Sequence, residues 1–537
     1  MTLLDSLLTL AWTLSEVLSD ATAYFSTACF PQVLMTLIVD LPDVGLPRNI
    51  KITALQTLNT LTDENMDILS AMGPHVSSLV SMVVAPPFTP ANTPTTTDEK
   101  REDLHQAHES EMKILATSIL YNLRLSMDTA TTPASANLAA PSLAKLLELS
   151  APALTTILSR DINPLIRTCV ELHRQDQSKQ EVPMTDEEMS RVESGVESDL
   201  DQKLQVLEAH INLINLALEI LSNLCSDDVP MDEDWEDCEA RILADEDDEE
   251  EDGDEDMVLA DDEVMTAVAV EENIDPRLLF LASQTTIISH LLSLIAVPQS
   301  HVESVDALIS ILLLRTLSSL TNVLLFIPAS KTSLTLSSDD YIVPPTLWST
   351  LFNLAHTHAS SNPELFSQIL SSLYAMSRLN LPYTITQANI NDLIQTGLET
   401  SSPIPVRARC ISVISQIARH PRLNPSSTST TSSAPSQVTI PAQEIESLNK
   451  AITLFLVTSL ESLTQFPTPP SSTPLLTEIL NAIFDVFGDE SRDSLERVFW
   501  ELNIGKRLKD GSDAVRRMVR ILSTIFLKDQ QHHHPAN

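Results

Sequence analysis

Hydrophobic residues recur along the chain at spacings of three and four, which is the period of one face of an α-helix. Four stretches share this pattern and a similar ending: "ALQTLNTLTDEN" from Ala54, "ATSILYNLRLS" from Ala116, "ALEILSNLCSD" from Ala217 and "RTLSSLTNVLL" from Arg315. Convincing alternation of apolar and polar residues, as in strands, is scarce. Because helices this apolar need neighbours to cover them, the pattern predicts an all-α armadillo/HEAT-repeat α-solenoid.

The same helical pattern continues toward the C-terminus in "QILSSLYAMSRL", "RCISVISQIARHP", "EILNAIFDVFGDE" and "MVRILSTIFLKD". We therefore predict N-terminal armadillo-like repeats over residues 1–226 and C-terminal HEAT-like repeats over residues 264–528. A short disordered tail is expected at residues 529–537, where three histidines follow one another.

Long polar insertions interrupt the predicted helices. Those at about 86–103, 178–202 and 424–440 contain too few apolar residues to order themselves by burial. A fourth insertion, residues 227–263, contains 22 acidic residues and a single basic one, Arg241. We call residues 227–263 the acidic segment, and we expect all four insertions to project from the solenoid as loops.

Composition narrows the classes of function. The 537 residues, 43% of them hydrophobic, can bury a large core, whereas only eight are glycine and no phosphate-binding glycine motif is present. The five cysteines are scattered without a C-x-x-C spacing, which is typical of a reducing compartment and opposes a disulfide scaffold or a zinc site. No signal peptide and no uncharged apolar span of about 18 residues is evident, so we expect a soluble intracellular protein that does not bind membranes.

Catalytic and metal-binding patterns are weak. His105 and His108 could share a helical face, but no further ligands are signalled, and we interpret them as surface residues. The acidic segment resembles the start of an EF-hand loop at Asp248, yet Leu259 stands where that loop requires a bidentate glutamate. We therefore predict a protein that is not an enzyme and that has no cofactor, no catalytic residues and no metal site.

The first candidate binding site lies within the acidic segment. The formal net charge of the chain is −42, and this segment carries about half of the excess. Such a run often serves only to solvate a loop, and that interpretation stays open. A tryptophan is unusual in a spacer, however, and negative charge beside a concave surface would attract a cationic partner. The candidate cargo-binding residues are Asp232, Glu233, Asp234, Trp235, Glu236 and Asp237.

A second candidate surface is a row of asparagines. Asn122, Asn223 and Asn322 occupy the same place in "LYNL", "LSNL" and "LTNV", two residues after a core leucine. Armadillo repeats that hold extended peptides use an asparagine at a similar point of the third helix. An asparagine that bonds to a neighbouring repeat would give the same pattern, so both interpretations remain.

Two stretches resemble the symportin family, the relatives of HEAT repeat-containing protein 3. They are "ALEILSNLCSDDVPMDEDWED", a repeat helix that runs into an acidic loop with tryptophan, and "LTEILNAIFDVFGDESRD" near the C-terminus. The resemblance implies a chaperone and import adaptor that holds two basic large-subunit ribosomal proteins of the 5S particle. It also implies a transportin-type karyopherin as a partner, contact with 5S rRNA only through the cargo, and shuttling between cytoplasm and nucleus.

The chain departs from the symportin pattern at its N-terminus. Symportins begin with a basic tail and a Pro-Tyr import signal, whereas this sequence starts within a helical segment at Met1. Pro382-Tyr383 is a Pro-Tyr pair, but its sequence context indicates a turn between two packed helices and not an exposed import signal. We therefore interpret the sequence as N-terminally incomplete or as dependent on another signal. The alternative function is a karyopherin-like or histone-handling acidic scaffold.

Overall fold

A computed structural model gives the fold of the chain. It describes residues 2–18, 24–25, 29–39, 46–63, 65–85, 99–129, 142–180, 198–226, 275–284, 286–298, 300–327, 343–344, 346–358, 362–379, 386–399, 401–419, 442–464, 473–487, 498, 501–502 and 506.

The described part of the chain is helical and contains no strand. In the first half, the helices are α1 (Thr2–Val17), α3 (Phe30–Val39), α4 (Arg48–Thr62), α5 (Met66–Met72), the 3₁₀ turn η2 (Gly73–His75), α6 (Val76–Val84), α7 (Glu99–Thr129), α8 (Leu143–Leu158), α9 (Asn163–Gln180) and α11 (Asp199–Cys225). In the second half, they are α13 (Pro276–Ser283), α14 (Thr286–Ile295), α15 (Glu303–Phe326), α16 (Leu347–His358), α17 (Pro363–Ser377), α18 (Gln387–Leu398), α19 (Ile404–Ala418), α20 (Ala442–Thr464) and α21 (Thr473–Phe487).

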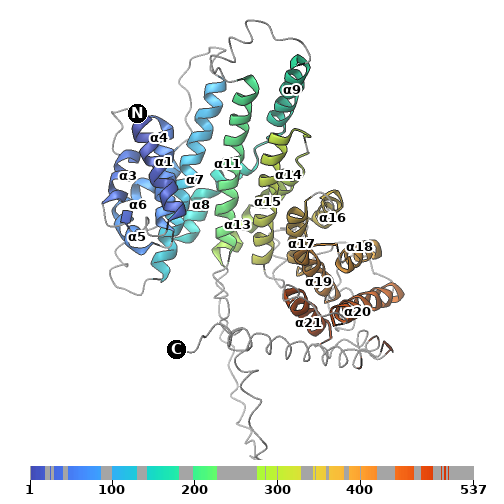
Figure 1. The fold of residues 1–537 in the computed structure, drawn as a ribbon. Helices are drawn as coiled ribbons and strands as arrows, with labels where there is room; N and C mark the ends of the chain where they lie inside the picture. The colour runs from blue at the N-terminus through green and yellow to red at the C-terminus, as the bar shows by residue number, and fades with distance from the viewer. Residues whose placement is uncertain are drawn as a thin grey trace, which may run out of the picture.

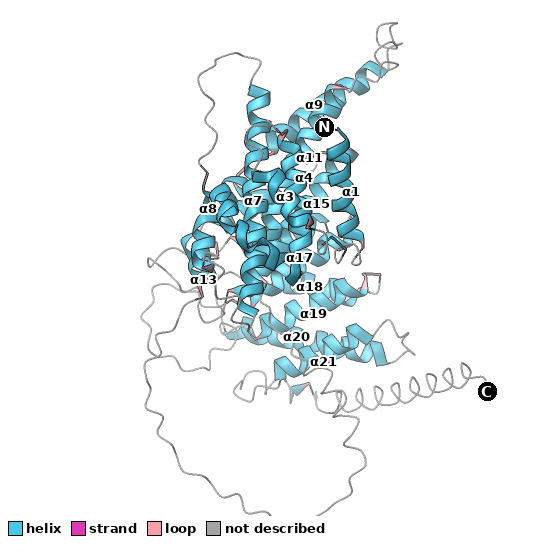
Figure 2. Ribbon diagram, turned by 90° about the vertical axis from the view of Figure 1, so that its left-hand side faces the viewer, coloured by secondary structure: helices cyan, strands magenta, loops and turns pink. Residues whose placement is uncertain are grey.

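One set of helices forms a continuous row. Helices α1, α4, α7, α11, α15, α17, α19 and α21 each pack against the next member of this set, and the remaining helices flank them (Figure 1). The buried apolar side chains form one cluster that runs from Leu8 to Val486. The predicted all-α solenoid is therefore confirmed, and the four repeated stretches that begin at Ala54, Ala116, Ala217 and Arg315 lie in α4, α7, α11 and α15. We call this set the helix row. The view in Figure 2, turned by 90°, shows the same all-helical build.

Small hydroxyl side chains join neighbouring helices of the row. The Ser319 hydroxyl of α15 donates to the Leu218 carbonyl of α11 at 2.9 Å and lies 2.8 Å from the Ser222 hydroxyl. Farther along, the Thr321 and Ser372 hydroxyls lie 2.9 Å apart between α15 and α17. Ser319, Thr321 and Ser372 are buried, so each hydroxyl needs the partner that the next repeat supplies. Serine and threonine thus let the helices approach closely and help to fix how they are rotated.

Two predicted loops are shorter than the sequence pattern indicates. Helix α7 begins at Glu99, inside the insertion predicted at 86–103, because its charged first turns consist of good helix formers. Helix α9 continues to Gln180, and α11 starts at Asp199, where Ser198 and Asp201 form a capping box. The boundaries predicted at 178–202 are therefore wrong by a few residues at each end. The middle of each insertion and residues 424–440 lie outside the described residues.

Stacking explains the strong hydrophobicity of some helices. By length and composition alone, Asp67–Val84, α11 and α15 could each cross a membrane, and the bent pair α13 and α14 could form a fourth span. Helix α15, however, packs against α11 on one side and α17 on the other, and 56% of its most apolar window is buried inside the protein. Its apolar residues therefore meet other repeats.

One glycine is needed for close packing. A Cβ atom on Gly397 of α18 would lie 2.8 Å from Cζ of Phe455 on α20. Arg407 of α19 also donates from Nε to the Gly397 carbonyl at 3.0 Å. The absence of a side chain at this one position lets α18 lie close to both helices.

Candidate binding site at the base of the acidic segment

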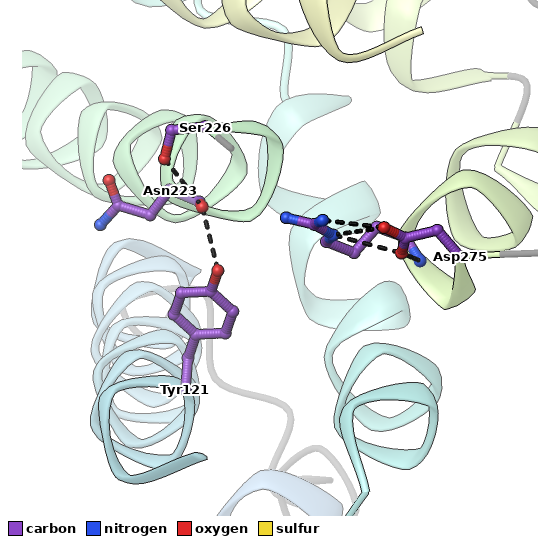
Figure 3. Close-up of polar contacts among 5 residues, drawn as sticks. Tyr121, Asn223, Ser226 and Asp275 are labelled. Atoms are coloured by element: carbon purple, nitrogen blue, oxygen red, sulfur yellow. Dashed lines mark hydrogen bonds and ion pairs between the residues drawn. The ribbon is translucent and has the colours of Figure 1, made fainter. Parts of the chain in front are cut away.

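The acidic segment leaves the fold at the end of α11. Ser226 is the last residue described before it, and Asp275, just ahead of α13, is the next one described after it. The candidate residues Asp232, Glu233, Asp234, Trp235, Glu236 and Asp237 lie outside the described residues. We call Ser226 and Asp275, the described residues nearest to the segment on either side, its two attachment points, and Figure 3 labels both.

The first attachment point is held by helix α7. The Tyr121 hydroxyl of α7 donates to the Asn223 carbonyl at 3.0 Å, and the Ser226 hydroxyl donates to the same carbonyl at 3.1 Å (Figure 3). Asn223 is in the last turn of α11, where backbone carbonyls lack helical partners. Tyr121 is buried, so its hydroxyl bonds within the protein. These two bonds hold the last turn of α11 against α7.

The second attachment point is a charged N-cap. The Asp275 carboxylate accepts from the Arg277 backbone N–H at 2.8 Å and from the Arg277 guanidinium at 2.8 to 3.2 Å. Partial burial opposes ionisation of Asp275, but the hydrogen bonds and the charge of Arg277 outweigh it and lower the pKa. The guanidinium also lies 4.6 Å from the ring centre of Phe326 in α15. The start of helix α13 is thereby tied to α15.

An open hollow lies between the two helices that frame this region. Glu219, Ser222 and Asn223 of α11 line it together with Arg315, Ser318 and Ser319 of α15, and its volume is about 280 Å³. Glu219, Asn223 and Arg315 are exposed there. Sites that enclose small molecules are usually larger, at about 300–1,000 Å³, and mostly apolar. This polar hollow is better suited to one or two side chains of a protein partner.

Negative charge extends from the hollow toward the N-terminal repeats. Partial desolvation of the carboxylate raises the pKa of Glu219. Arg315 opposes the increase, while the charges of Asp63 and Glu16 add to it. Glu16, Asp63 and Glu219 belong to α1, the end of α4 and α11. We call these three residues the acidic trio, and a cationic side chain beside Glu219 would oppose the increase in its pKa.

The three predicted asparagines lie on consecutive helices of the row but differ in their surroundings. Asn223 is exposed and lines the hollow. Asn122 of α7 is half-buried, and its amide nitrogen lies 3.4 Å from the Thr62 hydroxyl of α4, which is a long hydrogen bond between repeats. Asn322 of α15 is also half-buried. Peptide binding by these asparagines stays a prediction, and Asn223 is the one that the described hollow includes.

Several residues of this site were not predicted from the sequence. Glu219 is the one charged residue between Ile211 and Cys225 in α11, and Arg315 is the one between Ala307 and Phe326 in α15, so these isolated charges could have marked exposed positions. Tyr121 precedes the predicted Asn122 by one residue, but nothing in the sequence indicates that it reaches the end of α11. Its partner is 102 positions away, so only the stacking of repeats brings them together.

In the described part of the chain, neither potential metal ligands nor thiols form a cluster. No group of three or more histidine, cysteine, aspartate or glutamate side chains there could hold a metal ion. Cys169, Cys225 and Cys410 are buried and form no disulfide, and burial raises the pKa of Cys410 to about 12. These three thiols therefore act as small apolar side chains. Cys238 lies in the acidic segment, outside the described residues.

One carboxylate between α4 and α7 gives a prediction about pH. Burial raises the pKa of Glu111 to about 7, although a hydrogen bond from the Gln56 amide at 3.1 Å opposes the shift. The unfolded chain releases this proton near the ordinary value of 4.5. Between those two pH values the folded state binds this proton more tightly than the unfolded state does. The free energy of unfolding therefore falls as the pH rises from about 4.5 to 7, and Glu111 accounts for at most about 3 kcal/mol of that decrease.

Glu111→Gln keeps a neutral partner for Gln56 and removes this titration. We expect the variant to gain stability relative to the parent at pH 8 and to gain little at pH 5, as measured by urea denaturation at both values. Glu171→Gln, on the exposed surface of α9, is the matched control and should show no such difference. Equal gains for Glu111→Gln at the two pH values would contradict the assignment.

Comparison with known proteins supports the repeat assignment. Residues 281–532 match the family model described as "SYO1-like, TPR repeats", which confirms the resemblance to the symportin family over this part of the chain. None of the curated proteins compared matches the sequence significantly.

Solved structures of other helical proteins also match at low identity. A crystal structure of importin beta matches at 11% identity with a TM-score of 0.23 over 96% of this chain. This chain spans about 62% of the importin beta chain. A structure from a study of a phosphorylation switch between cadherin and beta-catenin matches at 13% identity with a TM-score of 0.17, over 94% of this chain and 80% of that one.

Proposed function

Because residues 281–532 carry symportin-type repeats, we propose that this chain is a non-enzymatic chaperone and nuclear import adaptor for basic ribosomal proteins. The cargo would be the two large-subunit ribosomal proteins that bind 5S rRNA, and the adaptor would support assembly of the 5S particle. A transportin-type karyopherin would be the import partner, and the protein would shuttle between cytoplasm and nucleus. The support for the import step is the family resemblance.

The observation that supports the cargo proposal is the point of the fold to which the acidic segment is attached. The segment begins four residues after Asn223, which lines the polar hollow together with Glu219 of the acidic trio. Proteins that bind RNA do so largely through lysine and arginine contacts to phosphate. A segment with 22 carboxylates can occupy such a surface in place of RNA, while the hollow receives a neighbouring part of the cargo. Both surfaces would act without catalysis.

The hollow provides a direct test of the proposal. The double variant Glu219→Gln with Asn223→Ala removes one charge and one amide while leaving the Asn223 carbonyl that Tyr121 binds. A net hydrogen bond is worth about 0.5–1.5 kcal/mol and an exposed ion pair about 0–1 kcal/mol. We therefore expect roughly a 3- to 50-fold weaker affinity for the purified ribosomal proteins, measured by titration calorimetry or fluorescence anisotropy.

The matched control makes the same two kinds of change elsewhere. Glu171→Gln on α9 with Asn353→Ala on α16 alters exposed residues outside the hollow and should leave the affinity unchanged. Histones serve as competing cationic ligands. Equal affinity for histones and for the ribosomal pair would favour the alternative, a histone-handling or karyopherin-like acidic scaffold. Failure to bind either ligand would contradict the chaperone proposal.

A further inference from the structure

A separate pocket lies among helices α16, α17 and α18. Its apolar lining comes from Phe352 and Ala355 of α16, Phe366, Leu370 and Leu373 of α17, and Leu393 of α18. Its volume is about 210 Å³. Helix α16 packs against α17, and α18 packs against α19, so α16 and α18 are successive flanking helices beside the row (Figure 1). The pocket therefore opens where two repeats meet.

The size and lining of the pocket restrict what it can hold. At about 210 Å³ it is smaller than the usual range of about 300–1,000 Å³ for small-molecule sites, and it has no lysine or arginine in its lining to bind a phosphate. One leucine- or phenylalanine-sized side chain would fill it. All six apolar residues of the lining are buried, so the apolar wall of the pocket consists of packed side chains.

The rim of the pocket is polar and carries more acidic than basic groups. The His356 ring nitrogen Nε2 lies 3.3 Å from the Asp392 carboxylate, which links α16 to α18 across the opening. Glu399, Gln395 and Thr396 complete the rim, and the Thr396 hydroxyl donates to the Asp392 carbonyl at 2.9 Å. Two carboxylates thus face one histidine. This imbalance favours a guest whose apolar side chain is followed by a positive one.

Apolar surface continues beyond this opening along α18. A second, shallower hollow is lined by Asn391, Ile394 and Leu398 and shares Gln395 and Glu399 with the pocket. Leu398 is 38% exposed. A short extended segment could therefore place one side chain in the pocket and continue over α18, with Glu399 between the two contacts.

From these features we propose that the α16–α18 pocket docks an extended partner segment with a leucine or phenylalanine beside a lysine or arginine. The apolar side chain occupies the pocket, and the basic one pairs with Asp392 and Glu399. A second copy of this chain is a poor occupant, because its net charge of −42 opposes self-association. The α16–α18 pocket and the hollow between α11 and α15 lie on different helices. The pocket would therefore stay available while the hollow holds cargo.

The test is a selection from a random dodecamer peptide library against the full-length protein. Enriched peptides should share an apolar residue next to lysine or arginine, and one such peptide is then titrated by fluorescence anisotropy. Thr396→Phe fills the opening and should weaken the binding of this peptide at least tenfold. Asp392→Asn with Glu399→Gln keeps the shape and should weaken it about three- to tenfold, with a loss of the preference for a basic residue.

The controls separate docking from folding and from cargo binding. Thr357→Phe is matched to Thr396→Phe, because both hydroxyls bond to the carbonyl four residues earlier and Thr357 lies outside the pocket. It should leave the affinity unchanged, as should Glu219→Gln with Asn223→Ala. No enrichment, peptides without the apolar–basic pair, or equal binding to all variants would overturn the proposal. Binding of the peptide by a protein that ignores ribosomal cargo would uphold this pocket while contradicting the proposed function.

Discussion

Neutralising Asp232, Glu233, Asp234, Glu236 and Asp237 as asparagine and glutamine is expected to weaken capture of the basic ribosomal proteins by one to two orders of magnitude. Each exposed ion pair contributes only about 0–1 kcal/mol, but five together reach the size of an anchoring contact. The measurement is a titration of purified cargo at low and at raised salt. The parent protein should lose affinity steeply with salt, and the variant should lose less.

A second set in the same segment is the matched control. Replacing Asp247, Asp248, Glu249, Glu250 and Glu251 removes the same charge but leaves the surroundings of Trp235 intact. A smaller loss of affinity here would locate the contact around the tryptophan. Equal losses would mean that total charge alone matters, and unchanged cargo affinity in both variants would reject a role for the acidic segment.

Replacing Leu320 with alanine is expected to lower the free energy of unfolding of the repeats around α15 by about 2–5 kcal/mol. Leu320 is fully buried in the helix that joins α11 to α17, and its truncation leaves a cavity between repeats. In a solenoid each repeat is held only by its neighbours, so a weak point in the middle uncouples the two halves. Urea denaturation followed by circular dichroism should show an earlier or a split transition.

Ile311→Ala is the control on the same helix. Ile311 is 50% exposed, so its removal should change stability by less than about 0.5 kcal/mol. Hydrogen exchange would show where the effect of Leu320→Ala is concentrated, and we expect faster exchange in α11, α15 and α17. Similar stability of the two variants would contradict the view that stacking at α15 holds the repeats together.

The sequence was most informative where apolar residues repeat with helical spacing. The stretches from Ala217 and Arg315 were predicted as equivalent repeat helices, and they lie side by side as α11 and α15. Helix ends in charged regions were predicted less well. Glu99 starts α7 because glutamate, lysine and arginine favour helices even where few apolar residues show the period.

The candidate sites depended more strongly on tertiary structure. Asn223 could be singled out from the sequence, but its neighbours in the hollow could not. Glu219 and Arg315 are 96 positions apart in sequence, and their proximity depends on how α11 and α15 are rotated. The pocket among α16, α17 and α18 left no recognisable sequence pattern, because each of its apolar residues also looks like an ordinary core residue.

By itself, the sequence determined the helical class, the repeated unit and the concentration of negative charge in one segment. These properties follow from local spacing and composition, which neighbours along the chain control. Only the tertiary structure decided that Tyr121 holds the end of α11, that the charges of Glu16 and Asp63 act on Glu219, and that two carboxylates belong to the rim of the α16–α18 pocket. Such contacts join residues from different repeats, so they depend on the stacking geometry of the whole solenoid.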